Sequence, residues 1–333
     1  MLPPIEDYGL IGDLHGVALV SKQGSIDYCC LPSLDAPTLF AALLDETKGG
    51  RFAIRPSEDF QSEHSYLKDT NILCTRFKSA AGAAELMDFM PVPQQEMPLA
   101  DDQTHVHQIC RLLRCTRGRL RMTADYAPRP DYARVIPRLV GDARRLSCEG
   151  PGGELVLACR GAVMELDFPE PGRAQWRFTL NAGDEVSFGL RAGRGSGESN
   201  CGHALAETRS FWMDWLQGCE AGRCRPYGKF QDRLNRSLLA LKLLTFAPTG
   251  AIAAAATTSL PECIGGGRNW DYRFAWLRDA SFTLKALLNM GHLSETDAFA
   301  AWLHRLYGAA GADHLQIMYS LRGEATLTEE ILP

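Results

Sequence analysis

The sequence predicts a protein of mixed class with two domains, an antiparallel β-sandwich followed by a helical domain. Up to about Leu190, short apolar runs alternate with clusters of Gly, Pro, Asp and Ser, which is typical of antiparallel strands joined by turns. After the glycine-rich stretch at 193–202, apolar residues recur at helical spacing. A length of 333 residues is sufficient for two domains. The expected parts are a sandwich over 1–200, a linker helix region over 201–227 and a helical domain over 228–333.

Turn residues in the front half predict three hairpins and one short helix. Each hairpin has glycine in or beside its turn, where a positive φ is needed. The paired runs are 17–20 with 26–29, 72–77 with 85–89, and 176–180 with 186–190. A short helix is predicted at 38–44, because four large apolar residues there recur at helical spacing.

The back half predicts several helices. The linker helix carries Phe211, Trp212 and Trp215, and the following helix is apolar on most sides, so it must be buried. Its apolar residues are Leu234, Leu238, Leu239, Leu241, Leu243, Leu244 and Phe246. A further helix is predicted from about Asp279 to Met290, and it ends at Gly291, which suits the left-handed position after a helix end. Ser294-Glu295-Thr296-Asp297 resembles a capping box at the start of another helix, whose apolar stripe is Phe299, Trp302, Leu303 and Leu306.

Composition excludes several classes of function. A net charge of -5 does not fit a nucleic-acid-binding protein, which needs clustered Lys and Arg for phosphates. The chain has no apolar stretch of about 18 residues, so we expect no membrane span. The first residues lack the basic and apolar regions of a secretory signal, so we expect a cytoplasmic protein.

Eleven cysteines, an odd number that includes the adjacent pair Cys29-Cys30, are interpreted as buried reduced thiols rather than a disulfide framework. The spacings from Cys110 to Cys115 and from Cys219 to Cys224 give little support for zinc. We therefore expect no metal and no cofactor.

The segment 265–280 concentrates glycine, aromatic rings and charged groups immediately before a predicted helix. Sugars offer hydroxyls to charged partners and apolar ring faces to aromatic side chains, so this composition favours a monosaccharide site. A structural interpretation competes with it. Asp279 would then be a helix N-cap, Arg278 an ion-pair partner, and Trp270 and Trp276 ordinary core aromatics.

The segments 257–262 and 268–280 resemble bacterial glycoside hydrolase family 15, which contains glucoamylases and trehalase-like enzymes. In the front half, 8–13, 24–28, 88–92 and 129–134 look like the family's trehalase-like N-terminal domain. The resemblance therefore covers nearly the whole chain.

The resemblance implies a sandwich joined to an (α/α)6 barrel and inverting hydrolysis of terminal α-glucosidic bonds in trehalose, maltose or a glucan. It also implies that Arg278 and Asp279 bind glucosyl hydroxyls, that Trp276 shapes the pocket and that Tyr272 lies near the anomeric centre. The sequence departs from the family at two loop positions, Gly267 and Ala256. Formation of a homo-oligomer is left open.

Inverting hydrolysis requires two carboxyl groups roughly 6.5–9.5 Å apart, one acting as acid and one as base. In the family both are glutamates farther along the barrel, so we expect the catalytic pair beyond residue 333 and a truncated barrel that is inactive alone. The glutamates that the back half does contain lie in no matching motif; they are Glu262, Glu295, Glu324, Glu329 and Glu330. Two alternatives remain, an inverting disaccharide phosphorylase and a non-catalytic sugar-binding module.

Overall fold

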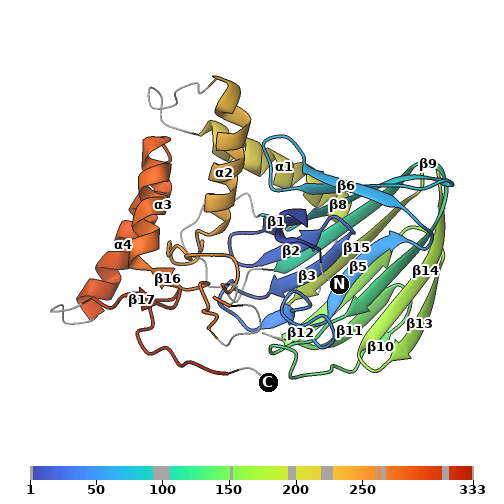
Figure 1. Ribbon diagram of the computed structural model, residues 1–333, viewed down its shortest axis with the longest axis horizontal. Coiled ribbons are helices and arrows are strands. Elements are labelled where there is room, and N and C mark those ends of the chain that lie inside the picture. Colours follow the sequence, from blue (N-terminus) through green and yellow to red (C-terminus); the bar gives the residue numbers. More distant parts are fainter. Residues whose placement is uncertain are drawn as a thin grey trace. The chain divides into compact units, whose positions relative to one another are not determined.

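The computed structural model describes residues 3–92, 106–150, 153–193, 200–218, 228–259, 262–263, 268–309 and 315–331 (Figure 1). These residues form two compact units, and the division falls between Phe211 and Trp212. We call the part up to Phe211 the N-terminal unit and the part from Trp212 onward the C-terminal unit.

The N-terminal unit is built of antiparallel strands that follow a short 3-10 helix at Ile5–Asp7. The order of hydrogen-bonded strands along the main path is β1-β2-β3-β5-β9-β15-β12-β11-β10, and β4, β6, β7, β8, β13 and β14 branch from it. The strands are β1 (Tyr8–Gly12), β2 (Val17–Ser21), β3 (Ser25–Cys30), β4 (Thr38–Phe40), β5 (Arg51–Pro56), β6 (Gln61–Tyr66), β7 (Leu73–Lys78), β8 (Gly82–Phe89), β9 (His107–Ala127), β10 (Val140–Gly141), β11 (Arg145–Gly150), β12 (Gly153–Arg160), β13 (Met164–Glu170), β14 (Arg173–Asn181) and β15 (Glu185–Ala192).

The long strand β9 connects two layers of the sheet. Its first part pairs with β8 and β15, and its second part pairs with β5 and β14. Between the two parts, Gly118 has φ 73°, a conformation that favours glycine. The strand therefore leaves one layer and enters the other, so the sheet folds over its own core.

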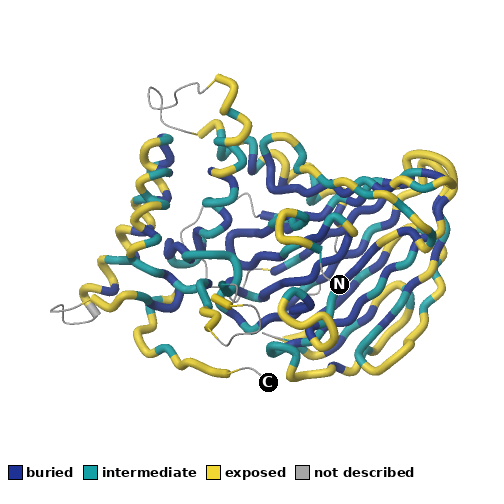
Figure 2. Tube along the Cα trace, viewed as in Figure 1, coloured by how far each residue is buried: buried dark blue, intermediate teal, exposed yellow. Residues whose placement is uncertain are grey.

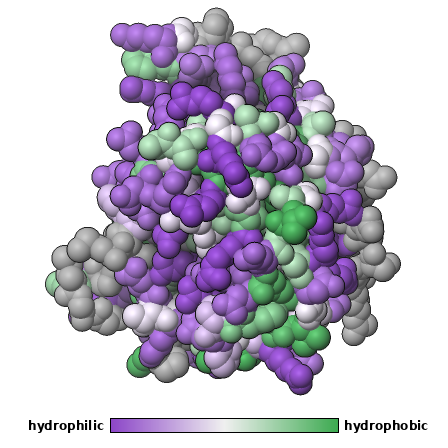
Figure 3. All heavy atoms as spheres, turned by 90° about the vertical axis from the view of Figure 1, so that its right-hand side faces the viewer, coloured by the Kyte–Doolittle hydropathy of each residue, from purple (hydrophilic) through white to green (hydrophobic). Residues whose placement is uncertain are grey.

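Aromatic side chains from both layers meet in this core. The ring centroids of Phe52 and Phe188 lie 5.9 Å apart, and those of Trp176 and Phe188 lie 5.8 Å apart. Figure 2 shows buried residues running along the central strands. The face of the molecule in Figure 3 is mainly hydrophilic, with hydrophobic residues in smaller areas. This contrast is the expected result of strands that alternate between core and solvent.

Among the described residues of the N-terminal unit, Arg111 and Asp88 form a fully buried ion pair. Nε of Arg111 lies 2.7 Å from Oδ1 of Asp88, and both side chains have no exposed surface. The guanidinium also donates to the backbone carbonyls of Phe52 and, at 2.8 Å, of Gly24. A buried charge is tolerated only when it is paired and hydrogen-bonded, and this arginine meets both conditions.

Two of the three predicted hairpins are confirmed, since β2 pairs with β3 and β7 pairs with β8. The third is wrong. A tight turn joins β14 to β15, but β14 pairs with the second part of β9 and β15 with the first part. The alternation of apolar and polar residues in β14 and β15 is compatible with pairing to any strand, so it did not reveal that both pair with β9.

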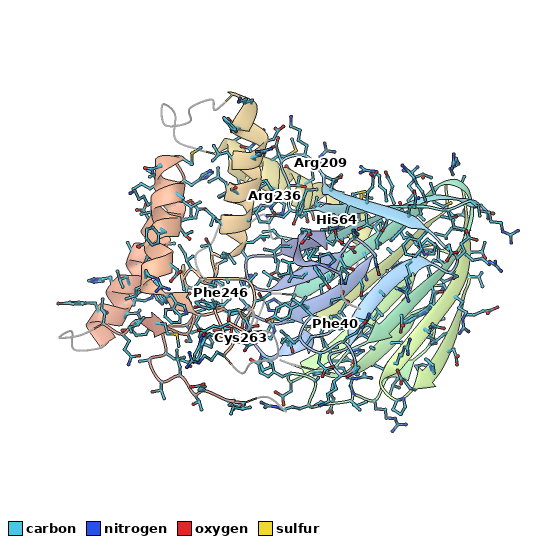
Figure 4. All side chains as sticks on the ribbon, in the orientation of Figure 1. Phe40, His64, Arg209, Arg236, Phe246 and Cys263 are labelled. Carbon is cyan, nitrogen blue, oxygen red and sulfur yellow. The ribbon has the colours of Figure 1, made fainter. Side chains whose placement is uncertain are left out.

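The predicted helix at 38–44 is also wrong. Thr38–Phe40 forms strand β4, which pairs with Cys29 and Cys30 of β3. All three β4 residues are buried, and Phe40, labelled in Figure 4, belongs to the core. Since the strand is covered on both faces, its apolar residues do not alternate, and the run resembles one side of a helix.

The described part of the C-terminal unit consists of helices and a short two-stranded sheet. Helix α1 (Cys201–Gln217) crosses the boundary between the units, and the short 3-10 helix η2 (Gly228–Phe230) leads into α2 (Gln231–Leu243). Strand β16 (Ala275–Trp276) runs directly into α3 (Leu277–Asn289), which is followed by α4 (Leu293–Ala309) and β17 (Met318–Tyr319). None of the described helices is both long and apolar enough to cross a membrane.

The ends of these helices differ partly from the prediction. Gly291 follows α3 with φ 84°, as its residue type predicts. The capping box is wrong, because α4 begins at Leu293 and Ser294 lies inside its first turn. The Ser294 hydroxyl donates instead to Oε2 of Glu295 at 2.9 Å. Helix α2 buries Leu238, Leu239 and Leu243 and leaves its other leucines half-buried, so it is less covered than predicted.

Candidate functional site

The four predicted site residues lie around the point where β16 enters α3. Trp276 is the last residue before α3 and is extended, with φ -87° and ψ 119°. It pairs with Met318 of β17, and the backbone N–H of Leu277 donates to the carbonyl of Ile317 at 3.2 Å. Two backbone contacts therefore fix the start of the helix and the orientation of the tryptophan.

Two aromatic rings form the apolar part of the site. Tyr272 and Trp276 are stacked, with ring centroids 5.5 Å apart and an angle of 30° between the ring planes. The guanidinium of Arg278 lies 5.5 Å from the centroid of the Trp276 ring, within the range of a cation–π contact. Nε1 of Trp276 is buried and has no hydrogen-bond partner among the described residues, so it is an available donor.

Arg278 and Asp279 form the polar part of the site. Nη2 and Nε of Arg278 lie 3.0 and 3.1 Å from Oδ2 of Asp279, and the two side chains are 62% and 33% exposed. Asp279 is in the first turn of α3, where the helix dipole favours a carboxylate. The pair offers both donors and acceptors to solvent, which is what recognition of hydroxyl groups requires.

The structural interpretation of these residues is partly contradicted. The N-cap position of α3 is Trp276, with no side-chain capping bond, so Asp279 is not the cap. Trp270 is 47% exposed and is therefore not a core aromatic. The structure brings Tyr272, Trp276, Arg278 and Asp279 together, while their roles in sugar binding stay predictions.

A second arginine supports the loop that carries Tyr272. Arg273 is buried, and its backbone N–H and Nε donate to Oδ1 of Asp271 at 3.0 and 2.9 Å. The carbonyl of Tyr272 accepts a bond from the backbone N–H of Ala255 at 2.8 Å. This half-buried neighbourhood includes Ala256, whereas Gly267 lies outside the described residues. The role of Arg273 was missed from sequence, although its spacing from Asp271 allows the pairing.

The C-terminal unit also contains a buried charged cluster drawn from three helices. Nζ of Lys242 lies 2.6 Å from Oε1 of Glu295, which also accepts a bond from Nε1 of Trp215 at 2.8 Å. The ring of His292 stacks on Trp215 with centroids 4.2 Å apart, and burial lowers the pKa of this histidine. The cluster ties α1, α2 and α4 together.

Glu295 stays ionised in this cluster. Burial raises its pKa, but attraction to Lys242 and hydrogen bonds from Lys242 and Trp215 outweigh burial and hold the pKa at about 2, below the usual 4.5. Its carboxylate is engaged by a cation and an indole, so it is a structural anion rather than a proton donor. This role of Glu295 could not be predicted from the sequence, because Trp215 and Lys242 are distant along the chain.

The cysteines that the structure describes are not gathered into a metal centre. Among the nine cysteines that the structure describes, eight are buried free thiols, as expected, and Cys263 is exposed. The described residues contain no group of three or more His, Cys, Asp or Glu side chains that could hold a metal ion. Cys219 and Cys224 lie outside the described residues.

Stacked aromatic rings and an Arg–Asp pair at a helix start are groups that can contact the apolar faces and the hydroxyls of a sugar. Comparison with known families agrees. Residues 1–210 match the family described as trehalase-like, N-terminal, and residues 228–331 match glycosyl hydrolases family 15. The match to the trehalase-like N-terminal family covers more than half of the chain, so the chain belongs to that family. Its residues 228–331 are similar to glycosyl hydrolases family 15.

Curated relatives are similar along nearly the whole chain. The trehalase of Mycolicibacterium smegmatis is 31% identical over 99% of this chain and 52% of its own length. The trehalase of Mycobacterium tuberculosis is 30% identical over 98% of this chain and 50% of its own length. The trehalase of Thermoplasma volcanium is 29% identical over 99% and 51%. The chain therefore spans about half the length of these relatives.

Proposed function

We propose that this chain belongs to an inverting α-glucoside hydrolase and supplies the groups that hold the glucosyl unit. Trehalose is the proposed substrate, because the relatives that match nearly the whole chain are named trehalases. We further propose that α2, α3 and α4 are early helices of an (α/α)6 barrel, in a domain that begins near residue 228. The family match over 228–331 supports this assignment.

The observation that carries the proposal is the contact among Tyr272, Trp276, Arg278 and Asp279. Stacked rings offer a face to the apolar side of a pyranose. The guanidinium donates to ring hydroxyls, and the Asp279 carboxylate accepts from them. The pairing at 3.0 Å orients both groups before a sugar arrives, so little ordering is left to occur on binding.

The chemical step requires other residues. Asp279 is paired with Arg278, and Asp271 is paired with Arg273. A carboxylate held by a guanidinium is suited to binding hydroxyls and poorly suited to donating a proton. We propose that the acid and the base are glutamates outside this group of residues.

Asp279→Asn tests the assignment in the protein produced from its complete gene. Loss of a charged hydrogen bond to a sugar costs about 1.5–3 kcal/mol, so kcat/KM for trehalose should fall about 10- to 100-fold. Asp297→Asn makes the same change at an exposed position on α4 and should leave kcat/KM unaltered. Equal kinetics for Asp279→Asn and the unchanged protein on trehalose and maltose would remove Asp279 from the site.

A second candidate function is sugar binding without turnover, which the pairing of Asp271 and Asp279 with arginines favours. The protein produced from its complete gene separates the two candidates. Calorimetric binding of trehalose with no glucose release above background supports the binding role, and catalytic glucose release supports the hydrolase. Catalytic glucose release by the 333 residues alone, lost on changing one of their own carboxylates, would show that these residues hold their own acid and base. Phosphate-dependent formation of glucose 1-phosphate would identify a phosphorylase instead.

A further inference from the structure

The N-terminal unit contains a left-handed turn made of three consecutive residues that are not glycine. Asp131, Tyr132 and Ala133 have φ values of 56°, 54° and 64°. L residues visit this region singly, and tyrosine and alanine have no special tolerance for it. Strained turns of this kind persist where the surroundings impose them, and they cluster at sites that hold ligands.

The surroundings of this turn do impose it. The backbone N–H of Ala133 donates to the carbonyl of Arg129 at 3.2 Å, and that of Arg134 donates to the carbonyl of Asp131 at 3.0 Å. Arg129 is itself anchored, because its backbone N–H donates to the carbonyl of Leu39 at 2.9 Å and its Nη1 to that of Gly172 at 2.7 Å. These hydrogen bonds hold the backbone of the turn in place, and with it the positions from which its side chains project.

The displayed side chains are an aromatic ring, a guanidinium and a carboxylate. The guanidinium of Arg134 lies 5.7 Å from the centroid of the Tyr132 ring. Nη1 of Arg134 lies 3.6 Å from Oδ1 of Asp131, and the two side chains are 33% and 44% exposed. An exposed ion pair at this distance contributes little to stability by itself, so these side chains are not spent on a strong internal ion pair.

The same three chemical groups form the candidate site in the C-terminal unit. There, the guanidinium of Arg278 lies 5.5 Å from the Trp276 ring and 3.0 Å from Asp279. We propose that Asp131, Tyr132 and Arg134 form a second carbohydrate-binding site, on the N-terminal unit, for an uncharged pyranose. This proposal concerns binding alone and is independent of the catalytic assignment.

The chemistry of the turn defines the ligand. Asp131 and Arg134 carry opposite charges that cancel each other, and Nη1 of the neighbouring Arg129 is engaged by the carbonyl of Gly172 at 2.7 Å, so the Asp131–Arg134 pair itself does not favour an anionic ligand. The Asp131 carboxylate accepts from a hydroxyl, and the Tyr132 ring packs against the apolar face of the sugar. Either a free disaccharide or the end of a glucan chain presents such a glucosyl unit.

Amide exchange and calorimetry on the 333-residue chain test this second site. The background is Asp279→Asn, which weakens the first site, and the probes are trehalose and maltoheptaose. Sugar should protect the amides of 129–135 from exchange. Asp131→Asn keeps the backbone, because asparagine tolerates left-handed φ, and it should weaken the remaining sugar binding by about tenfold or more. Tyr132→Ala should do the same.

A matched control is Glu85→Gln, which breaks an exposed Arg–Glu pair in the same unit, with 3.1 Å between Nε of Arg76 and Oε1 of Glu85. It should leave sugar binding unchanged. Protection by trehalose supports a site for a free disaccharide, and protection by maltoheptaose alone supports a site for a glucan end. No protection of 129–135 by either sugar, or unchanged affinity in Asp131→Asn with its fold intact, would overturn the proposal. If Asp279→Asn removes all binding heat, the turn is not an independent site.

Discussion

Glu295→Gln should destabilise the C-terminal unit in a pH-dependent way. The change removes the anion that lies 2.6 Å from Nζ of Lys242, whose side chain is 14% exposed. Breaking a buried pair is costly because the remaining charge has no counterion. Because this ion pair joins α2 to α4, the free energy of unfolding of the C-terminal unit should fall by several kcal/mol.

The size of the loss follows from the pKa of Glu295. A shift from 4.5 to about 2 corresponds to about 3 kcal/mol of stabilisation by the ionised carboxylate. A lowered pKa gives stability that is fully present above pH 4.5 and is lost as the pH falls from 4.5 towards 2. At about pH 3 the unchanged protein keeps about 1.5 kcal/mol of this stabilisation. The difference in unfolding free energy between the unchanged protein and Glu295→Gln should therefore be roughly half of its value near neutral pH.

Urea unfolding followed by far-UV circular dichroism measures both values. Glu262→Gln is the matched control, because it breaks an exposed pair with Arg268 in the same unit, with side chains 58% and 78% exposed. That control should cost less than about 1 kcal/mol at either pH. A cost for Glu295→Gln below about 1 kcal/mol near neutral pH, or one that does not shrink near pH 3, would refute the reasoning.

Three further predictions concern stability and accessibility. Asp88→Asn should cost about 3–5 kcal/mol in urea unfolding, because it leaves the Arg111 guanidinium buried without its anion; a cost under about 1 kcal/mol would contradict this. Ala133→Gly should raise Tm by about 1–3 °C in calorimetry, since glycine accepts φ 64° without a Cβ clash, and a lower Tm would argue against strain. Among the cysteines that the structure describes, an alkylating reagent should label Cys263 first in mass spectrometry, and equal labelling of buried Cys29 would contradict the burial that raises the pKa of that thiol.

Local signals in the sequence were sufficient for parts of the fold. Gly24, with φ 76°, occupies the turn between β2 and β3, and Gly82 begins the second strand of the β7–β8 hairpin. Each signal lies beside the strands that it joins, so neighbouring residues alone predicted the pairing. The helix end at Gly291 was predictable for the same reason.

Non-local pairing could not be predicted in this way. The alternating residues of β14 and β15 fit a hairpin as well as they fit two parts of β9. The choice depends on the length of β9 and on its change of layer near Gly118, far away in the sequence. A pattern of period two gives the buried face of a strand but not the identity of its partner.

In the candidate site, too, local features could be predicted from the sequence and non-local ones could not. Trp276, Arg278 and Asp279 are neighbours in sequence and stand at a helix start, so their proximity could be predicted from a short motif. The ribbon that fixes Trp276 could not, because β17 supplies Met318 from beyond two helices. A short sequence motif therefore predicts which functional side chains lie close together, but not the distant strand that holds their backbone in place.

The left-handed turn at 131–133 is a place where the observed backbone conformation disagrees with the preferences of its residues. Propensity argues against tyrosine and alanine at positive φ, so no local rule predicts the turn, and tertiary anchors such as Arg129 impose it. Local preference and final structure usually agree in a foldable sequence, and disagreements are concentrated at sites of function. The exposed Asp131–Arg134 pair stabilises the fold too little to offset the strain of three left-handed residues by itself. Binding of a ligand by the side chains of the turn, as proposed above, would account for both the strain and the residue types.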